Sequence, residues 1–86
     1  MKDLNGSVQR DGETILSPIS FNYDASDQRG AFVVYGGDQF AIEPGGPYRL
    51  NFPDGRWAEM LISAITPLAT TQGSLVSFVI SGELQD

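Results

Sequence analysis

Turn-forming residues recur along the chain about every ten residues, and this spacing limits the fold more than any other feature. Residues of high strand propensity, mainly Val, Ile, Phe and Tyr, fill the intervals. Such a pattern is typical of a small all-β sandwich or barrel. It predicts strands at about 7–10, 13–23, 31–35, 39–43, 48–52, 57–66 and 74–84.

The length and composition indicate a single domain that spans residues 1–86. A chain of 86 residues has room for one core, and a hydrophobic content of 41% is enough to build it. Because the chain has no Cys and no His, neither a disulfide nor a zinc site is expected to stabilise it. We therefore expect an all-β fold, a small antiparallel β-barrel or tight sandwich of six to seven strands with no significant helix.

The segment Pro53-Asp54-Gly55 predicts the register of the hairpin around it. Pro presets the first turn position, and Gly takes the left-handed conformation that closes a three-residue loop with a bulge. This loop sets Leu50 opposite Ala58 and Arg49 opposite Glu59, so one face is apolar and the other carries an opposite-charge couple. A two-residue loop would place Leu50 against Glu59, and the bulged register is therefore the prediction.

The last hairpin predicts an unexpected second apolar face. Setting Thr66 opposite Ser74 places Ile62 against Phe78 on the core side. The other face then carries Trp57, Leu61, Ile65, Leu75 and Val79. Because a monomer seldom exposes so large an apolar stripe, we predict that strand 57–66 is central and buried on both faces, under the N-terminal hairpin or another subunit.

Two further hairpins are predicted in the N-terminal half. Asp11-Gly12 suits a two-residue loop, which places Arg10 beside Glu13 and Val8 opposite Ile15. Gly36-Gly37 can join the strands at 31–35 and 39–43 through a loop of two or three residues. Most aromatic side chains then fall on the core side: Phe21, Tyr23, Phe32, Phe40, Tyr48, Phe52 and Phe78.

Charge and hydropathy limit the partners that we expect. Eleven acidic and five basic residues give a net charge of −6, which repels nucleic acid and anionic lipid. No apolar run reaches the roughly 20 residues of a membrane span, and residues 1–12 lack the apolar core of a signal peptide. The default expectation is a cytoplasmic protein whose partner is another protein or a second copy of itself.

The residue types also argue against catalysis. Without His and Cys the chain lacks the usual nucleophilic and thiol chemistry. Its Asp residues stand where the chain turns, and Asp24 to Asp27 is only a fragment of a calcium loop. The Gly pairs precede no helix, so they are turns rather than phosphate cradles. We predict that the protein is not an enzyme and has no cofactor and no metal site.

The order of Asp24-Ala25-Ser26 with Gly30, then Pro44-Gly45, then the segments 48–52 and 73–78 resembles that of the PilZ domain. That family is a small β-barrel that binds a cyclic dinucleotide through N-terminal arginines and an Asp-x-Ser-x-x-Gly segment. Here the Gly stands one residue late, and Arg10 is the only Arg upstream of the segment. The resemblance implies a similar barrel without cyclic-dinucleotide binding, because anion capture depends on those arginines.

Three hypotheses for function follow from these patterns. The leading one is a non-catalytic protein-binding module that uses an apolar stripe with acidic surroundings, Trp57, Leu61, Ile65, Leu75 and Val79. The second is an acidic regulator or inhibitor that occupies a basic site on a partner protein. The third is a small-ligand-binding β-barrel whose mouth is ringed by Arg10, Arg29 and the loop 24–30.

Overall fold

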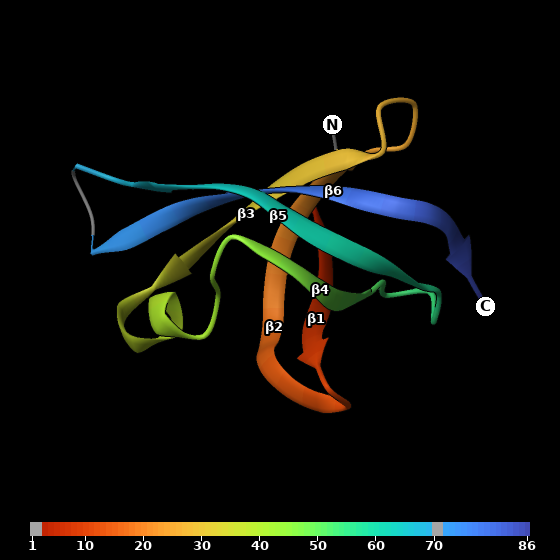
Figure 1. Ribbon diagram of the computed structural model, residues 1–86, viewed down its shortest axis with the longest axis horizontal. Coiled ribbons are helices and arrows are strands. Elements are labelled where there is room, and N and C mark those ends of the chain that lie inside the picture. Colours follow the sequence, from red (N-terminus) through yellow and green to blue (C-terminus); the bar gives the residue numbers. More distant parts are fainter. Residues whose placement is uncertain (1–2, 70–71) are drawn as a thin grey trace.

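The computed structural model describes residues 3–69 and 72–86, and its strands close into an antiparallel barrel (Figure 1). The strands are β1 (Leu4–Arg10), β2 (Glu13–Asp24), β3 (Arg29–Tyr35), β4 (Gly45–Asn51), β5 (Trp57–Pro67) and β6 (Gly73–Gln85). Around the barrel they follow the order β1-β2-β3-β6-β5-β4, and β4 pairs with β1 to close it. The prediction of a small antiparallel β-barrel is therefore confirmed.

The hairpin between β4 and β5 has the predicted register. Leu50 pairs with Ala58, and Arg49 lies opposite Glu59. The loop closes through the Phe52 N–H, which donates to the Arg56 carbonyl at 2.8 Å. Gly55 has a φ of 92°, the left-handed conformation that this loop requires.

The hairpin between β5 and β6 has the predicted register only in its middle. Ile62 pairs with Phe78, but one extra residue in β5 after Ile62 sets Ala64 opposite Ser77 and Ile65 opposite Val76. The predicted pairing of Thr66 with Ser74 is therefore wrong. A bulge of one residue turns every later side chain to the other face, and Ile65 packs against the core instead of facing outward.

The predicted strand at 39–43 is also wrong, because the chain after β3 forms the 3-10 segment η1 (Gly36–Phe40). Gly36 adopts a φ of 54°, and the Gln39 Nε2 donates to the carbonyls of Gly36 and Gln72 at 3.2 and 3.1 Å. These bonds hold η1 against the start of β6. β3 consequently pairs with β6 and not with the segment that follows it.

The hairpin between β1 and β2 turns as predicted at Asp11-Gly12, with Arg10 opposite Glu13. Register shifts on both sides of Val8 then set Val8 opposite Leu16 and not opposite Ile15. Leu16 is buried as a result, while Ile15 packs only partly against the core.

A single apolar core fills the barrel, and Phe21 meets two other core rings edge to face. Phe21 lies 5.3 Å from Phe52 and 6.2 Å from Phe78, between ring centres. Along β5, Ala58, Met60 and Ile62 are buried, whereas Glu59, Leu61 and Ser63 are exposed. The prediction that this strand is buried on both faces is wrong, because closing the barrel turns the second face of every strand to the outside.

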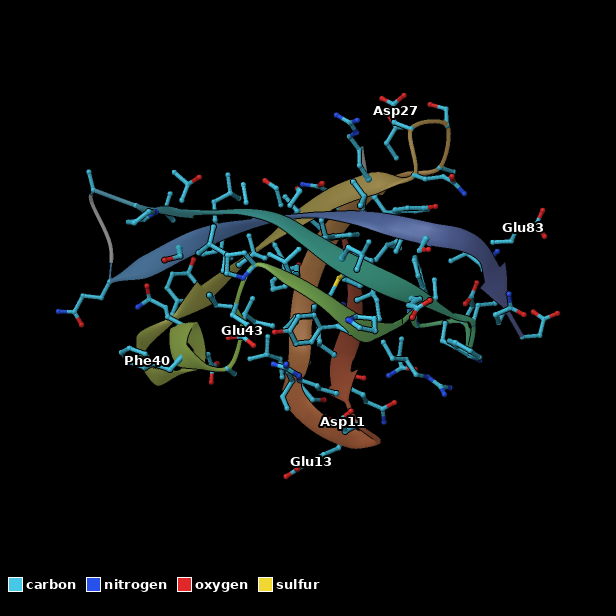
Figure 2. The ribbon with its side chains drawn as sticks, viewed as in Figure 1. Asp11, Glu13, Asp27, Phe40, Glu43 and Glu83 are labelled. Atoms are coloured by element: carbon cyan, nitrogen blue, oxygen red, sulfur yellow. The ribbon has the colours of Figure 1, made fainter. Side chains whose placement is uncertain are left out.

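Phe40 is the aromatic residue whose predicted core position is wrong. It is 91% exposed, and Figure 2 shows its side chain projecting from η1 away from the barrel. Ile42, two residues later, is buried in its place. The 3-10 turn explains this shift, because its side chains do not alternate between two faces as those of a strand do.

Candidate interaction surface

The predicted contact residues lie on the outer side of β5 and β6, with the exception of Ile65. Leu61 is 39% exposed and Leu75 36% exposed, and Trp57 and Val79 are half-buried. Leu61 pairs directly with Val79. The sequence therefore placed four apolar side chains on this side correctly, and the bulge removed the fifth.

Trp57 stands apart from the others, because it packs against β4. The guanidinium carbon of Arg49 lies 4.1 Å from the centre of the Trp57 ring, a cation–π contact. The Arg49 Nε donates to the Asn51 Oδ1 at 3.1 Å, which holds the guanidinium in place. Although Arg49 lies opposite Glu59, the two form no salt bridge within residues 3–69 and 72–86.

A hollow of about 400 Å³ beside Trp57 is lined by Arg10, Pro47 and Tyr48. The Arg10 Nη1 binds the Glu43 Oε1 at 3.0 Å and the Tyr48 hydroxyl at 3.3 Å. These partners raise the pKa of Arg10, the hydrogen bond to Glu43 most of all. The positive charge of Arg10 is therefore already paired with a carboxylate of the same chain.

Arg10 and Arg29 do not ring one barrel mouth. Arg10 pairs with Glu13 at one end of β2, and Arg29 pairs with Asp24 at the other end. About ten residues of extended strand separate them, a distance on the order of 30 Å. The predicted ring of arginines is wrong on this geometry.

A second group of outward apolar side chains, on β3, was not predicted from the sequence. Tyr35 is 60% exposed, and Val33 pairs with Leu75 of β6. The alternation along β3 could have revealed them, since Phe32 and Val34 face the core and their neighbours must face outward. We call Val33, Tyr35, Leu61, Leu75 and Val79 the apolar outer face.

A groove of about 460 Å³ lies beside this face, between β2 and β3. Pro18, Ile19 and Ser20 of β2 line it together with Val33, Val34 and Tyr35 of β3. Its other lining residues include Leu75 and the carboxylates of Asp3 and Asp38. The accessible lining of the groove is therefore mostly polar and carries negative charge, with apolar contact offered by side chains such as Leu75.

The two carboxylates with shifted pKa values close turns. The Asp24 Oδ1 accepts hydrogen bonds from the Ser26 hydroxyl at 2.7 Å and the Ser26 N–H at 3.0 Å, and these bonds lower the pKa of Asp24. The Arg56 N–H and guanidinium likewise lower the pKa of Asp54. Lowered pKa values suit turn anchors that are ionised at neutral pH rather than a general acid.

Among the described residues, no three acidic side chains are grouped closely enough to hold a metal ion. The same part of the chain contains no helix with the length and apolar character to cross a membrane.

Comparison with known proteins finds no match to a family model, a curated protein or a solved structure. The resemblance to the PilZ domain gains no support from these comparisons. The case for function rests on the geometry of the barrel surface alone.

Proposed function

We propose that the protein is a non-catalytic binding module that recognises a basic partner protein through the apolar outer face. The exposure of Tyr35, Leu61 and Leu75 on adjacent strands carries this proposal. The core is complete without these side chains, so the fold does not require them on the surface. Exposed apolar groups are typical of contact sites between proteins. Here they form two groups on the outside of the barrel: Leu75 with Val33 and Tyr35, and, four residues further along β6, Val79 with Leu61.

The charge of the chain favours a basic partner over a second copy. The net charge is −6, and four of the acidic side chains labelled in Figure 2 lie at the periphery of the view, Asp11 and Glu13 at one hairpin tip and Asp27 and Glu83 elsewhere. Two identical acidic surfaces repel, whereas a basic surface is attracted to them. Close to Tyr35 and Leu75, the carboxylates of Asp3 and Asp38 supply acidic groups for the rim of such a contact.

Panning the immobilised protein against a displayed library of random peptides tests the proposal. We expect the enriched peptides to be rich in Lys and Arg and to bind saturably. Leu61→Asp and Leu75→Asp should each weaken binding about tenfold or more, the equivalent of one anchor side chain. Thr14→Asp adds the same charge on the exposed part of β2 away from this face and should leave binding unchanged.

Two outcomes would contradict the proposal. One is a library that yields no saturable binder, or binders that neither Leu61→Asp nor Leu75→Asp weakens while both variants keep the melting temperature of the parent. The other is a dimer in light scattering that Leu61→Asp dissociates, which would place a second copy on the face.

An acidic regulator is the second candidate, favoured by the exposed carboxylates at the hairpin tips. The salt dependence of binding distinguishes the acidic regulator from the binding module. Binding through the apolar outer face should fall only modestly between low and physiological salt, whereas binding through the carboxylates alone should fall steeply.

A further inference from the structure

We propose that the partner contributes an extended, basic segment that adds a strand to β3 in the groove between β2 and β3. This inference rests on the proposed function and specifies how the partner is held. Strand addition of this type uses main-chain hydrogen bonds for affinity and side-chain pockets for specificity.

The ladder between β2 and β3 stops before β3 ends. β2 and β3 pair from Asp24↔Arg29 to Phe21↔Phe32 and no further. β3 pairs with β6 over its whole length, out to Tyr35↔Gly73. From Val33 to Tyr35, β3 therefore has a strand partner on one side only within the described residues.

The direction of the backbone groups in this stretch follows from the ladder with β6. The Gly36 N–H donates to the Gln72 carbonyl at 3.0 Å, and the Ile80 N–H donates to the Gln28 carbonyl at 2.8 Å. Residues that bond to a neighbour alternate along an antiparallel strand, so the even-numbered residues of β3 face β6. The carbonyl of Val33 and both backbone groups of Tyr35 point the other way, into the groove.

Pro18 explains why β2 does not cover this edge. Continuing the register of Phe21↔Phe32 would set Pro18 opposite Tyr35. Pro has no N–H to offer the Tyr35 carbonyl, and Pro on a strand edge is a common device against pairing. β1 occupies the opposite edge of β2, and the groove opens where β2 and β3 part.

The lining of the groove selects the chemistry of the incoming segment. Val33 and Leu75 offer apolar contact on the outer side of the barrel, and Asp3 and Asp38 add two carboxylates. Among residues 3–69 and 72–86, no Lys or Arg lines the groove. A segment that alternates apolar and basic residues matches both features, since side chains of an added strand point alternately to opposite faces.

The pair of variants Tyr35→Pro and Tyr35→Val tests the backbone directly. Both remove the aromatic ring, but only Tyr35→Pro removes the N–H that points into the groove, and neither disturbs a bond to β6. With a peptide selected from the random library as the probe, the reference is the binding of Tyr35→Val, which lacks the contacts of the aromatic ring but keeps the N–H. Tyr35→Pro should bind about tenfold more weakly or worse.

Backbone methylation of the same peptide supplies a second test that needs no variant protein. N-methyl groups on one alternate set of residues remove the donors that face β3, and those on the other set do not. We expect methylation of one set to abolish binding and methylation of the other set to be tolerated.

Hydrogen exchange and charge removal supply further tests. The Tyr35 amide should exchange rapidly with solvent in the free protein and become protected in the complex. Asp38→Asn should weaken binding, while Asp11→Asn at the hairpin tip should not.

These results separate the two proposals. A peptide that is weakened by Leu61→Asp but is indifferent to both methylation patterns overturns strand addition and leaves the binding module standing. Equal binding by folded Tyr35→Pro and Tyr35→Val also overturns it. If Tyr35→Pro does not fold, the binding of the N-methylated peptides decides whether the partner adds a strand to β3. A library that yields no binder overturns both.

Discussion

The guanidinium of Arg49 stacks on the indole ring of Trp57, 4.1 Å from its centre, although Glu59 lies directly opposite Arg49 on the neighbouring strand. The guanidinium contacts the aromatic ring of Trp57 and not the carboxylate of Glu59. An exposed ion pair contributes little in water, whereas stacking also covers apolar ring surface. The contact anchors Trp57 to its own barrel, which separates it from the apolar outer face.

Substitution of Arg49 should show which contact matters. Arg49→Ala should lower the free energy of unfolding by about 0.5–1 kcal/mol, the range for an exposed cation–π contact, and change the fluorescence of Trp57. Glu59→Gln should alter stability by less than about 0.5 kcal/mol. Urea denaturation followed by tryptophan fluorescence measures both, and a larger loss for Glu59→Gln would contradict the stacking account.

The bulge in β5 predicts opposite outcomes for two neighbouring apolar residues. Ile65 packs against the core, whereas Leu61 faces outward. Ile65→Ala should cost about 1–2 kcal/mol of unfolding free energy, below the range for a fully buried side chain. Leu61→Ala should cost less than about 0.5 kcal/mol. The reverse order in denaturant melts would indicate the unbulged register.

Gly30 is required by close packing. A Cβ at this position would lie 2.7 Å from the Cζ of Phe78 and would collide with the carbonyl oxygen of Asn22. Gly30→Ala should therefore destabilise the barrel by about 2 kcal/mol or more. Gly37→Ala is the matched control, since a Cβ there meets nothing within 4 Å, and it should be neutral in thermal melts.

The exposed Phe40 should contribute nothing to folding. Phe40→Ser should leave the free energy of unfolding within about 0.5 kcal/mol of the parent. Phe32→Ala, in the core, should cost about 3–5 kcal/mol. A substantial loss for Phe40→Ser in chemical denaturation would mean that Phe40 packs inside the barrel after all.

The turn at Asp24 should give a pH-dependent contribution to stability. Because hydrogen bonds from Ser26 lower the folded-state pKa of Asp24, the ionised carboxylate stabilises the fold above about pH 4, the ordinary value in an unfolded chain. That contribution is lost as the pH falls through the lowered folded value. Ser26→Ala should raise the pKa of Asp24 toward its ordinary value in an NMR titration.

Stability measured against pH completes this test. Ser26→Ala should be less stable than the parent at neutral pH, and the difference should shrink as Asp24 becomes protonated in both proteins. Ser81→Ala, an exposed serine on β6, should show no such pH dependence. A difference for Ser26→Ala that persists unchanged in acid would assign the effect to the hydroxyl alone.

The sequence by itself determined the barrel class and the hairpins whose turns are closed locally. The loop Pro53-Asp54-Gly55 fixes its register with residues adjacent in the chain, and so does Asp11-Gly12. The alternation of apolar residues likewise assigned Leu50 and Met60 to the core. Such signals are strong because their energy comes from neighbouring residues, with no long-range contact needed.

Tertiary structure alone decided the features that depend on distant partners. The bulge after Ile62 depends on the pairing of β5 with β6 and on the curvature of the barrel. The segment η1 is held by hydrogen bonds of Gln39 with Gln72 and Ser74, which lie far away in the sequence. Barrel closure turned the second face of β5 outward. It also exposed the edge of β3 beside Pro18, because which strand a residue fails to pair with depends on the whole order of the sheet.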